Sequence, residues 1–249
     1  MTRPDQSILG GKFKYHLSKV MPLNFDVRLS LTNGLKFVLR ARTMDRSVLK
    51  DIWVKSIYDQ HGVRVERGDT VVDIGAHVGI FSVYAAHRSE TGKVYAFEPF
   101  IENYTRLVAH RDLNHRSNLF PFHRGVSAVP GKKTFFLSPD RNTGGHSLFL
   151  KPESKRKVEI ETVTLAEFCA EHKLGRIDFL KLDCEGAEFE ILAASADVLK
   201  RVRKIALECH PFGLHTAQQM ADLLEGHGFT VIREKSLGSE IEMIYGRRA

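Results

Sequence analysis

The sequence contains few cysteines and no long uncharged stretch, and both shortages exclude whole classes of protein. Its 249 residues include only Cys169, Cys184 and Cys209, which are too scattered for a disulfide framework or for zinc ligands. The longest uncharged run, residues 74–86, is shorter than the roughly 20 apolar residues that a membrane span needs. The first residues lack the apolar segment of a signal peptide. We therefore expect a cytoplasmic protein with no membrane span.

The overall composition is that of a folded domain with an excess of positive charge. Hydrophobic residues make up 43% and charged residues 27%, as in globular proteins and unlike disordered chains. The formal net charge is +7. This excess leaves four interpretations open: a nucleic-acid partner, an anionic small molecule, a membrane surface, or solubility alone.

The first 60 residues differ in pattern from the rest of the chain. Residues 1–22 are basic and irregular, which predicts a loosely held arm. Apolar and polar residues alternate on both sides of Asn33-Gly34, the dipeptide that favours a β-hairpin turn. Apolar residues at helical spacing over 44–60 predict an amphipathic helix. We expect residues 1–60 to form an extension that packs on a domain of residues 61–249.

From residue 69 onward, short apolar runs alternate with helical segments, which predicts an α/β fold with a mostly parallel sheet. The seven expected strands cover residues 70–74, 93–97, 119–123, 177–182, 205–209, 230–234 and 240–245, the last two as an antiparallel edge hairpin. The helices expected between them cover 79–88, 101–113, 164–173, 186–194 and 215–227. Residues 130–162 interrupt the alternation with two short strands around a polar, glycine-rich loop, an insertion typical of a substrate pocket.

The first two strands end in residues suited to a nucleoside-containing cofactor. Asp73-Ile-Gly-Ala-His-Val-Gly79 joins a strand to a helix, and Glu98 ends the next strand. A carboxylate at Asp73 suits a ligand ammonium, and an acidic residue at Glu98 suits the hydroxyls of a ribose. Either S-adenosylmethionine (SAM) or a nicotinamide dinucleotide would fit. His77 stands where dinucleotide sites have a second glycine close to the pyrophosphate, so SAM is favoured.

The fourth and fifth strands end in candidate catalytic groups. Asp183, Glu185 and Glu188 follow one strand, and their charges are costly there unless a positive group, such as SAM, a metal ion or a lysine, lies nearby. Glu188 also suits the first turn of a helix. Glu208 and His210 end the fifth strand on the same side.

We expect His210 to be the first candidate for a general base, with Asp183 or Glu208 orienting it or replacing it, and Glu185 beside them. The sequence leaves open a Mg²⁺ ion held by Asp183 and either Glu185 or Glu208. His146, in the glycine-rich loop, is a weaker candidate.

Three motifs together resemble the FkbM-type family of SAM-dependent methyltransferases: residues 71–82, residues 94–99 and residues 178–188. The resemblance implies a class I methyltransferase fold and methyl transfer to a hydroxyl oxygen, often on a sugar or a polyketide-like compound. It implies that Asp73, Gly75 and Gly79 line the methionine part of SAM, that Glu98 holds the ribose, and that Gly125, Val126 and Ser127 lie near the adenine. We also count His77, Pro99 and Asp183 among the expected cofactor-binding residues.

The functional hypothesis is therefore a SAM-dependent O-methyltransferase that acts on a small hydroxylated molecule. Two alternatives remain: an RNA methyltransferase, suggested by the basic runs at 151–157 and 200–204, and a SAM-binding protein without catalysis. The expected cofactor site is acidic, so the excess positive charge must lie elsewhere. The excess charge then gives information about the acceptor or about an anionic surface, and none about the cofactor.

Overall fold

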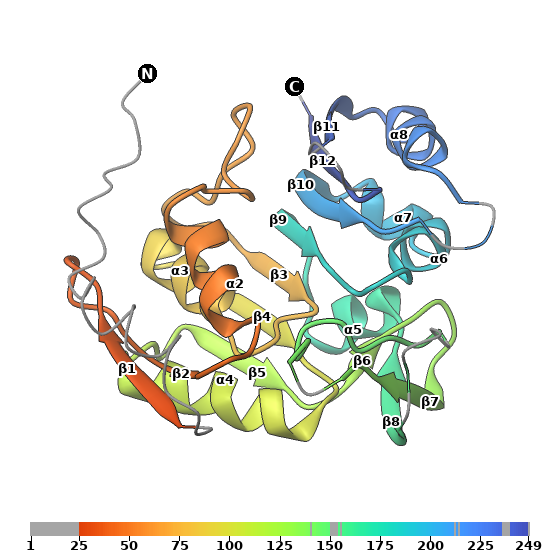
Figure 1. Ribbon diagram of the computed structural model, residues 1–249. Coiled ribbons are helices and arrows are strands. Elements are labelled where there is room, and N and C mark those ends of the chain that lie inside the picture. Colours follow the sequence, from red (N-terminus) through yellow and green to blue (C-terminus); the bar gives the residue numbers. More distant parts are fainter. Residues whose placement is uncertain are drawn as a thin grey trace.

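A seven-stranded sheet forms the centre of the protein. The computed structural model describes residues 25–139, 141–149, 154, 156–211, 213, 215–235 and 240–248. In this part of the chain the strand order is β11-β12-β10-β9-β3-β4-β5 (Figure 1). The strands are β3 (Val71–Ile74), β4 (Val94–Phe97), β5 (Leu119–Phe122), β9 (Ile177–Leu182), β10 (Val202–Cys209), β11 (Thr230–Lys235) and β12 (Glu242–Arg247). Only β12 runs against the others, so the expected α/β fold with a mostly parallel sheet is confirmed.

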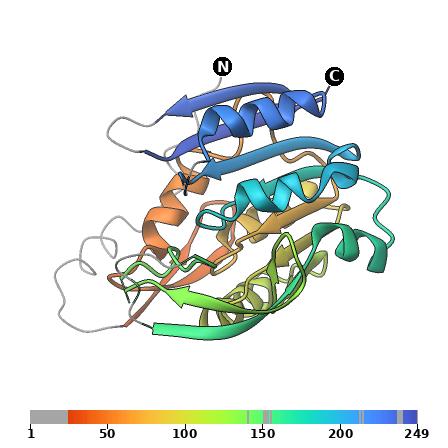
Figure 2. The same cartoon turned by 90° about the vertical axis from the view of Figure 1, so that its right-hand side faces the viewer.

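Helices cover both faces of this sheet, which explains why its inner strands are continuous apolar runs. One face packs against α3 (Ile80–Ser89) and α4 (Ile101–Leu113). The other packs against α5 (Leu165–Glu171), α6 (Glu188–Ala193), α7 (Ala196–Leu199) and α8 (Ala217–Gly226), as Figure 2 shows. The sequence predicted one helix over 186–194; the structure has α6 there and then α7 as a separate short helix.

The N-terminal extension shares the core of the sheet. It contains β1 (Asp26–Ser30), β2 (Lys36–Arg40) and α2 (Asp45–Trp53). Phe37 and Trp53 are buried in the same apolar cluster as Phe81 of α3. The expected hairpin is confirmed, whereas a domain boundary at residue 60 stays a prediction. The predicted arm of residues 1–22 lies outside the described residues.

The helix predicted over 44–60 is wrong in its second half. It ends at Trp53, and Ser56 takes a positive φ of 54°, a backbone conformation that no right-handed helix contains. The chain after α2 instead turns back toward the sheet, where Tyr58 packs edge-on against Phe81 with ring centroids 5.2 Å apart. Tertiary packing has overridden the helical pattern, and it brings Tyr58 to the carboxyl ends of the strands.

A second, three-stranded sheet lies beside the first, at the lower right of Figure 1. It has the order β6-β8-β7, with β6 (Gly125–Val126), β7 (Gly131–Leu137) and β8 (Arg156–Val163). Strands β7 and β8 are the two expected in the insertion. The loop between them is anchored by main-chain hydrogen bonds in both directions between Phe136 and Ser147. No helix in the described part of the chain is long and apolar enough to cross a membrane.

Candidate active site

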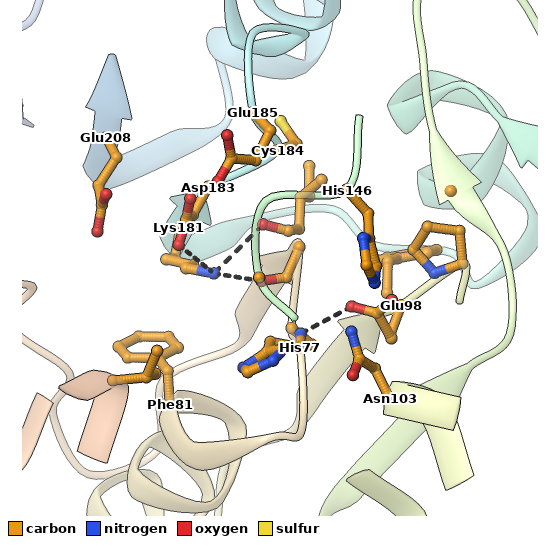
Figure 3. Close-up of a pocket in the computed structure, with 18 of the residues that line it drawn as sticks. His77, Phe81, Glu98, Asn103, His146, Lys181, Asp183, Cys184, Glu185 and Glu208 are labelled. Carbon is orange, nitrogen blue, oxygen red and sulfur yellow. Dashed lines mark hydrogen bonds and ion pairs between the residues drawn. The ribbon is translucent and has the colours of Figure 1, made fainter. Parts of the chain in front are cut away.

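A pocket opens at the carboxyl ends of the parallel strands. It lies where the chain order reverses between β3 and β9, the place where open α/β sheets bind their ligands. Among the predicted site residues, those that line it are Gly75, His77, Glu98, Pro99, Gly125, Val126, His146, Asp183, Glu185 and Glu208. Figure 3 shows Glu98 toward one end of the pocket and Glu208 toward the other.

The loop after β3 depends on backbone conformations that glycine favours. Gly75 has a φ of 78°, and a Cβ there would overlap the main-chain oxygen of Asp183. Gly79 has a φ of 80°, and a Cβ there would overlap Leu107 of α4. Gly75 therefore allows the ends of β3 and β9 to meet at the pocket, whereas Gly79 allows α3 to pack on α4 and does not line the pocket.

His77 also adopts the left-handed conformation, with a φ of 52°. Burial lowers its pKa to about 4, so the ring is neutral at pH 7. Nε2 lies 3.2 Å from the guanidinium of Arg40 and 3.0 Å from the hydroxyl of Thr143. Nδ1 is buried and has no hydrogen-bond partner among the described residues. His77 thus keeps one ring nitrogen available in the pocket wall.

Asp73 does not line the pocket; it lies beneath it, paired with Lys181. Lys181 Nζ lies 3.0 Å from Asp73 Oδ1, donates to the Gly75 carbonyl at 2.6 Å, and lies 4.0 Å from Asp183 Oδ2. Ser82 donates to the other oxygen of Asp73. Burial opposes the charge of Lys181, but Asp73 and Asp183 outweigh it and raise its pKa above the usual value. Lys181 is the positive group that balances these carboxylates, and a lysine was one of the expected partners.

Glu98 holds the loop together at the other end of the pocket. One of its oxygens accepts a hydrogen bond from the main-chain N–H of His77 at 2.8 Å, and the other accepts from that of Phe100 at 2.8 Å. Burial raises the pKa of Glu98 to about 8. Each oxygen keeps a further lone pair that can accept from a ligand hydroxyl. Pro99 and Val126 form an apolar wall beside it, while the Ser127 hydroxyl donates to the Val129 carbonyl at 2.6 Å and lies behind that wall.

Tyr58 joins two carboxylates that the sequence placed on different strands. Its hydroxyl lies 2.8 Å from Glu208 Oε1 and 3.1 Å from Asp183 Oδ2. Burial and the two negative charges raise the pKa of Tyr58 well above its usual value, so the hydroxyl remains a donor. Burial, followed by the charge of Asp183, raises the pKa of Glu208 to about 7. Sequence reasoning missed Tyr58, which is 150 residues from Glu208 and carries no motif.

His210 is paired with a buried carboxylate and does not line the pocket. Its Nδ1 lies 3.0 Å from Glu188, and its Nε2 lies 3.8 Å from Glu185. Burial opposes the charged ring, but the hydrogen bond and charge of Glu188, with the charges of Asp183 and Glu185, raise its pKa to about 10. An imidazole that is already protonated at pH 7 accepts no proton, so this pairing argues against His210 as the base. Glu188 also accepts from the N–H groups of Cys184 and Gly186, the structural role expected of it.

Asp183, Glu185 and His210 each offer one ligand atom within 4.8 Å of the others. This set does not suit Mg²⁺, which prefers oxygen ligands, because one of its members is an imidazole that Glu188 holds as a cation. Lys181 already supplies a positive charge to Asp183. The described residues therefore do not form a site suited to Mg²⁺.

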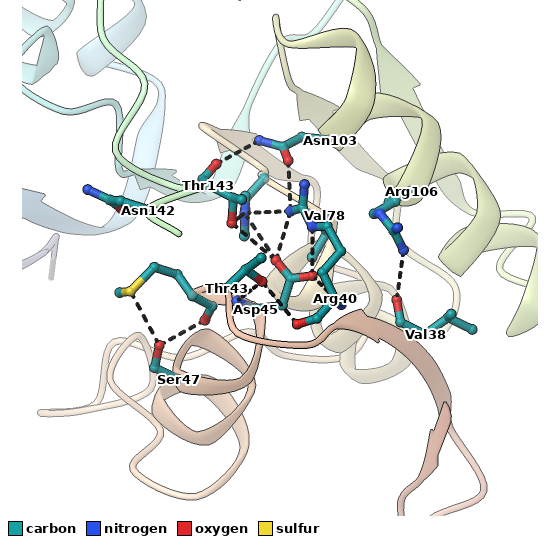
Figure 4. Close-up of polar contacts among 12 residues, drawn as sticks. Val38, Arg40, Thr43, Asp45, Ser47, Val78, Asn103, Arg106, Asn142 and Thr143 are labelled. Carbon is teal, nitrogen blue, oxygen red and sulfur yellow. Dashed lines mark hydrogen bonds and ion pairs between the residues drawn. The ribbon is translucent and has the colours of Figure 1, made fainter. Parts of the chain in front are cut away.

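The extension and the insertion together form the remaining walls. Apolar side chains of α2 and the turns after it line one side: Met44, Val48, Ile52 and Ile57. The insertion contributes Asn142, Gly144 and His146. Figure 4 shows the polar contact that joins the two: Thr143 of the insertion donates to Asp45 at 3.3 Å, and Asp45 is held by Arg40 of the extension at 2.7 Å. The insertion therefore shapes the pocket as the sequence predicted.

Comparisons with known proteins agree with this arrangement. The model of the methyltransferase FkbM domain matches residues 73–231. The protein 31-O-demethyl-FK506 methyltransferase FkbM of Streptomyces tacrolimicus is 28% identical over 231 residues, 80% of this chain and 88% of the relative. Hexuronic acid methyltransferase AglP of Haloferax volcanii is 27% identical over 145 residues, 58% of this chain and 57% of the relative.

Among solved structures, methyltransferase FkbM from Methylobacillus flagellatus KT aligns with a TM-score of 0.51 and 15% identity, over 75% of this chain and 45% of that one, which supports the fold. The family model covers more than half of the present chain and includes the strand ends that form the pocket. The chain therefore belongs to the FkbM family of SAM-dependent methyltransferases.

Proposed function

We propose that this methyltransferase transfers a methyl group from SAM to a hydroxyl oxygen of a small molecule, and that Glu208 accepts the hydroxyl proton. The observation that carries this proposal is the hydrogen bonding of Tyr58 to Glu208 and Asp183 in the wall of the pocket. The printed names of the relatives agree with such a reaction: one acts on a 31-O-demethyl compound and another on hexuronic acid.

The residues around the pocket suit SAM. The free lone pairs of Glu98 can accept from ribose hydroxyls, and Pro99 and Val126 offer an apolar surface for the adenine. The Nδ1 atom of His77, which has no hydrogen-bond partner among the described residues, suits a polar group of the cofactor. Asp183 lines the pocket and Asp73 does not, so we assign the ligand ammonium to Asp183. The expectation that Asp73 binds the ligand ammonium is thus replaced by one in which Asp183 does so.

The chain's own residues would act mainly by alignment and proton removal. Bound SAM supplies the methyl group, whose bond to sulfur breaks as the bond to the acceptor oxygen forms. Glu208 takes the proton released from that oxygen, and its pKa, raised to about 7 by burial and then by the charge of Asp183, suits a proton acceptor near neutral pH. Tyr58 holds Glu208 and Asp183 in place. The apolar side chains of α2 and the turns after it exclude water from the reacting groups.

The direct test measures SAM binding and methyl transfer separately. We expect the purified protein to bind SAM and to convert it to S-adenosylhomocysteine when a panel of hydroxylated sugars and natural products is supplied. Glu98→Gln should weaken SAM binding, because it replaces one of the two oxygens that accept from the main-chain N–H groups of His77 and Phe100 by an amide nitrogen, which only donates. Binding of SAM with no conversion on any acceptor would instead identify a non-catalytic SAM-binding protein.

A further inference from the structure

Helix α2 forms one wall of the active-site pocket, although it lies outside residues 73–231, the part of the chain that matches the FkbM domain. Met44, which is the N-cap of α2, lines the pocket together with Val48 and Ile52. These three apolar residues recur at a spacing of four, so they follow one side of the helix. We call them the α2 stripe. The strand ends that line the pocket thus belong to the shared domain, whereas this apolar wall belongs to the extension.

The packing of the core accounts for only part of the α2 stripe. Leu49 and Trp53 are buried in the apolar core, and so is Ile52 at one end of the stripe. Val48 is only partly buried, and Met44 is 42% exposed. Apolar surface in contact with water is unfavourable, and exposed apolar side chains that gather at a concave site are typical of ligand binding. Met44 and Val48 therefore offer an apolar surface to a bound molecule.

The two ends of α2 show which ligand this surface faces. Asp45, the first residue of α2, lies 3.5 Å from His77 in the loop after β3. Beyond the other end of the helix, Ile57 lines the pocket and Tyr58 donates to Glu208, the proposed proton acceptor. Helix α2 therefore runs along the pocket from the loop after β3 to Glu208. The groups proposed to hold SAM lie at the strand ends, so the acceptor is the ligand that faces α2.

The α2 wall offers few hydrogen-bond partners to a sugar. Among the residues of α2 that line the pocket, the only polar side chain is that of Asp51, and Lys55 pairs with it at 2.7 Å. A sugar ring carries a hydroxyl on almost every carbon, and a hydroxyl that is buried against apolar groups without a hydrogen-bond partner is unfavourable. An apolar skeleton has no such groups to satisfy, and its transfer out of water is favourable.

We propose that the α2 stripe recognises the methyl acceptor, and that the acceptor is an alcohol whose hydroxyl is carried by an apolar aliphatic or alicyclic skeleton. The hydroxyl lies at Glu208 and the skeleton lies against Met44 and Val48. Free sugars are then poor acceptors. The place of the acceptor beside Glu208 rests on the proposed function, whereas the apolar surface of α2 does not.

The first experiment measures binding by calorimetry to the full chain saturated with S-adenosylhomocysteine. The probes are two cyclohexane rings: butylcyclohexanol, which has a single hydroxyl and an alkyl chain, and myo-inositol, which has a hydroxyl on every carbon. We expect saturable binding of butylcyclohexanol with a negative heat-capacity change, because apolar surface is buried. We expect no saturable binding of inositol.

The double variant Met44→Gln, Val48→Thr nearly keeps the size of both side chains and makes them polar. It should weaken butylcyclohexanol binding roughly tenfold or more, and it should leave the affinity for S-adenosylhomocysteine unchanged. The matched control, Leu113→Gln with Ile101→Thr, makes the same kind of change at two exposed positions of α4 that do not line the pocket. It should bind both ligands as the unmodified protein does. Thermal unfolding of both double variants checks that they are folded.

Weaker butylcyclohexanol binding in the α2 variant alone supports recognition by α2. No saturable binding of butylcyclohexanol, tighter binding of inositol, or equal weakening in both double variants overturns it. Methyl transfer is then followed as S-adenosylhomocysteine formed from SAM. Saturable binding of butylcyclohexanol without methyl transfer supports recognition by α2 and counts against the proposed function. Methyl transfer to inositol alone overturns the apolar acceptor and leaves the proposed function standing.

Discussion

Replacement of Glu208 by glutamine gives the sharpest test of the proposed proton acceptor. The amide keeps an oxygen that can accept from Tyr58, which lies 2.8 Å away, so the local packing should survive. It cannot accept a proton at neutral pH. General-base catalysis typically contributes about 10²–10⁴-fold, and we expect kcat to fall by an amount in that range. That loss corresponds to about 3–5 kcal/mol of transition-state stabilisation.

The same reasoning predicts a pH dependence with a definite sign. Glu208 acts only when ionised, so kcat/KM should rise with pH through an apparent pKa of about 7. A bound sulfonium nearby would move this pKa downward, because a positive charge favours the carboxylate. The rise should be absent in Glu208→Gln. The measurement is S-adenosylhomocysteine formation between about pH 6 and 8, with SAM affinity followed by calorimetry.

His210 provides the matched comparison. Its pairing with Glu188 raises the pKa of the ring to about 10 and keeps it protonated at pH 7, so His210→Asn should affect kcat far less than Glu208→Gln. The reverse result would refute the reasoning. If Glu208→Gln kept near-normal turnover while His210→Asn abolished it, His210 would be the base, as the sequence suggested.

Three further predictions concern the residues that support the site. Tyr58→Phe removes a hydrogen bond that lowers the pKa of Glu208, so the pH profile of kcat/KM should move to higher pH. Lys181→Met leaves the buried charge of Asp73 without its partner, and urea unfolding should show a loss of about 3–5 kcal/mol. Gly79→Ala forces a side chain into a positive-φ position that is already filled, so thermal unfolding should show a loss of about 1–3 kcal/mol.

Controls are available for each of these variants. Gly175 has open space around it and no positive φ, so Gly175→Ala should leave the unfolding temperature nearly unchanged. An equal effect of both glycine variants would show that the overlap at Gly79 is unimportant. Lys181→Arg keeps the charge and should recover part of the lost stability. An unchanged pH profile in Tyr58→Phe would mean that Tyr58 does not act on Glu208.

Local patterns were sufficient for the framework of the active site. Continuous apolar strands predicted a buried parallel sheet, and the carboxyl ends of parallel strands meet at one edge, so the pocket could be located from the ends of the strands alone. Gly75, Glu98, Asp183 and Glu208 all line it. The motifs also identified the family, because their residues are close together in the chain.

Contacts between distant segments decided what these residues do. The helical pattern of 44–60 carried no sign that Tyr58 leaves the helix and joins Asp183 to Glu208, since that depends on packing against Phe81. A sequence lists charges but not their partners. Only the fold pairs Lys181 with Asp73 and His210 with Glu188, and burial then moves their pKa values in directions that no motif records.

The position of the excess positive charge was likewise determined partly by the sequence and partly by the tertiary structure. The sequence by itself determined that it lies outside an acidic cofactor site, because the strand-end motifs are rich in carboxylates. The tertiary structure decided which basic residues come together: arginines from the extension, α4 and the insertion line one cleft beside the pocket, and Asp45 and Asp26 pair with two of them. These positions span residues 40 to 156, and a cavity exists only after the chain has folded.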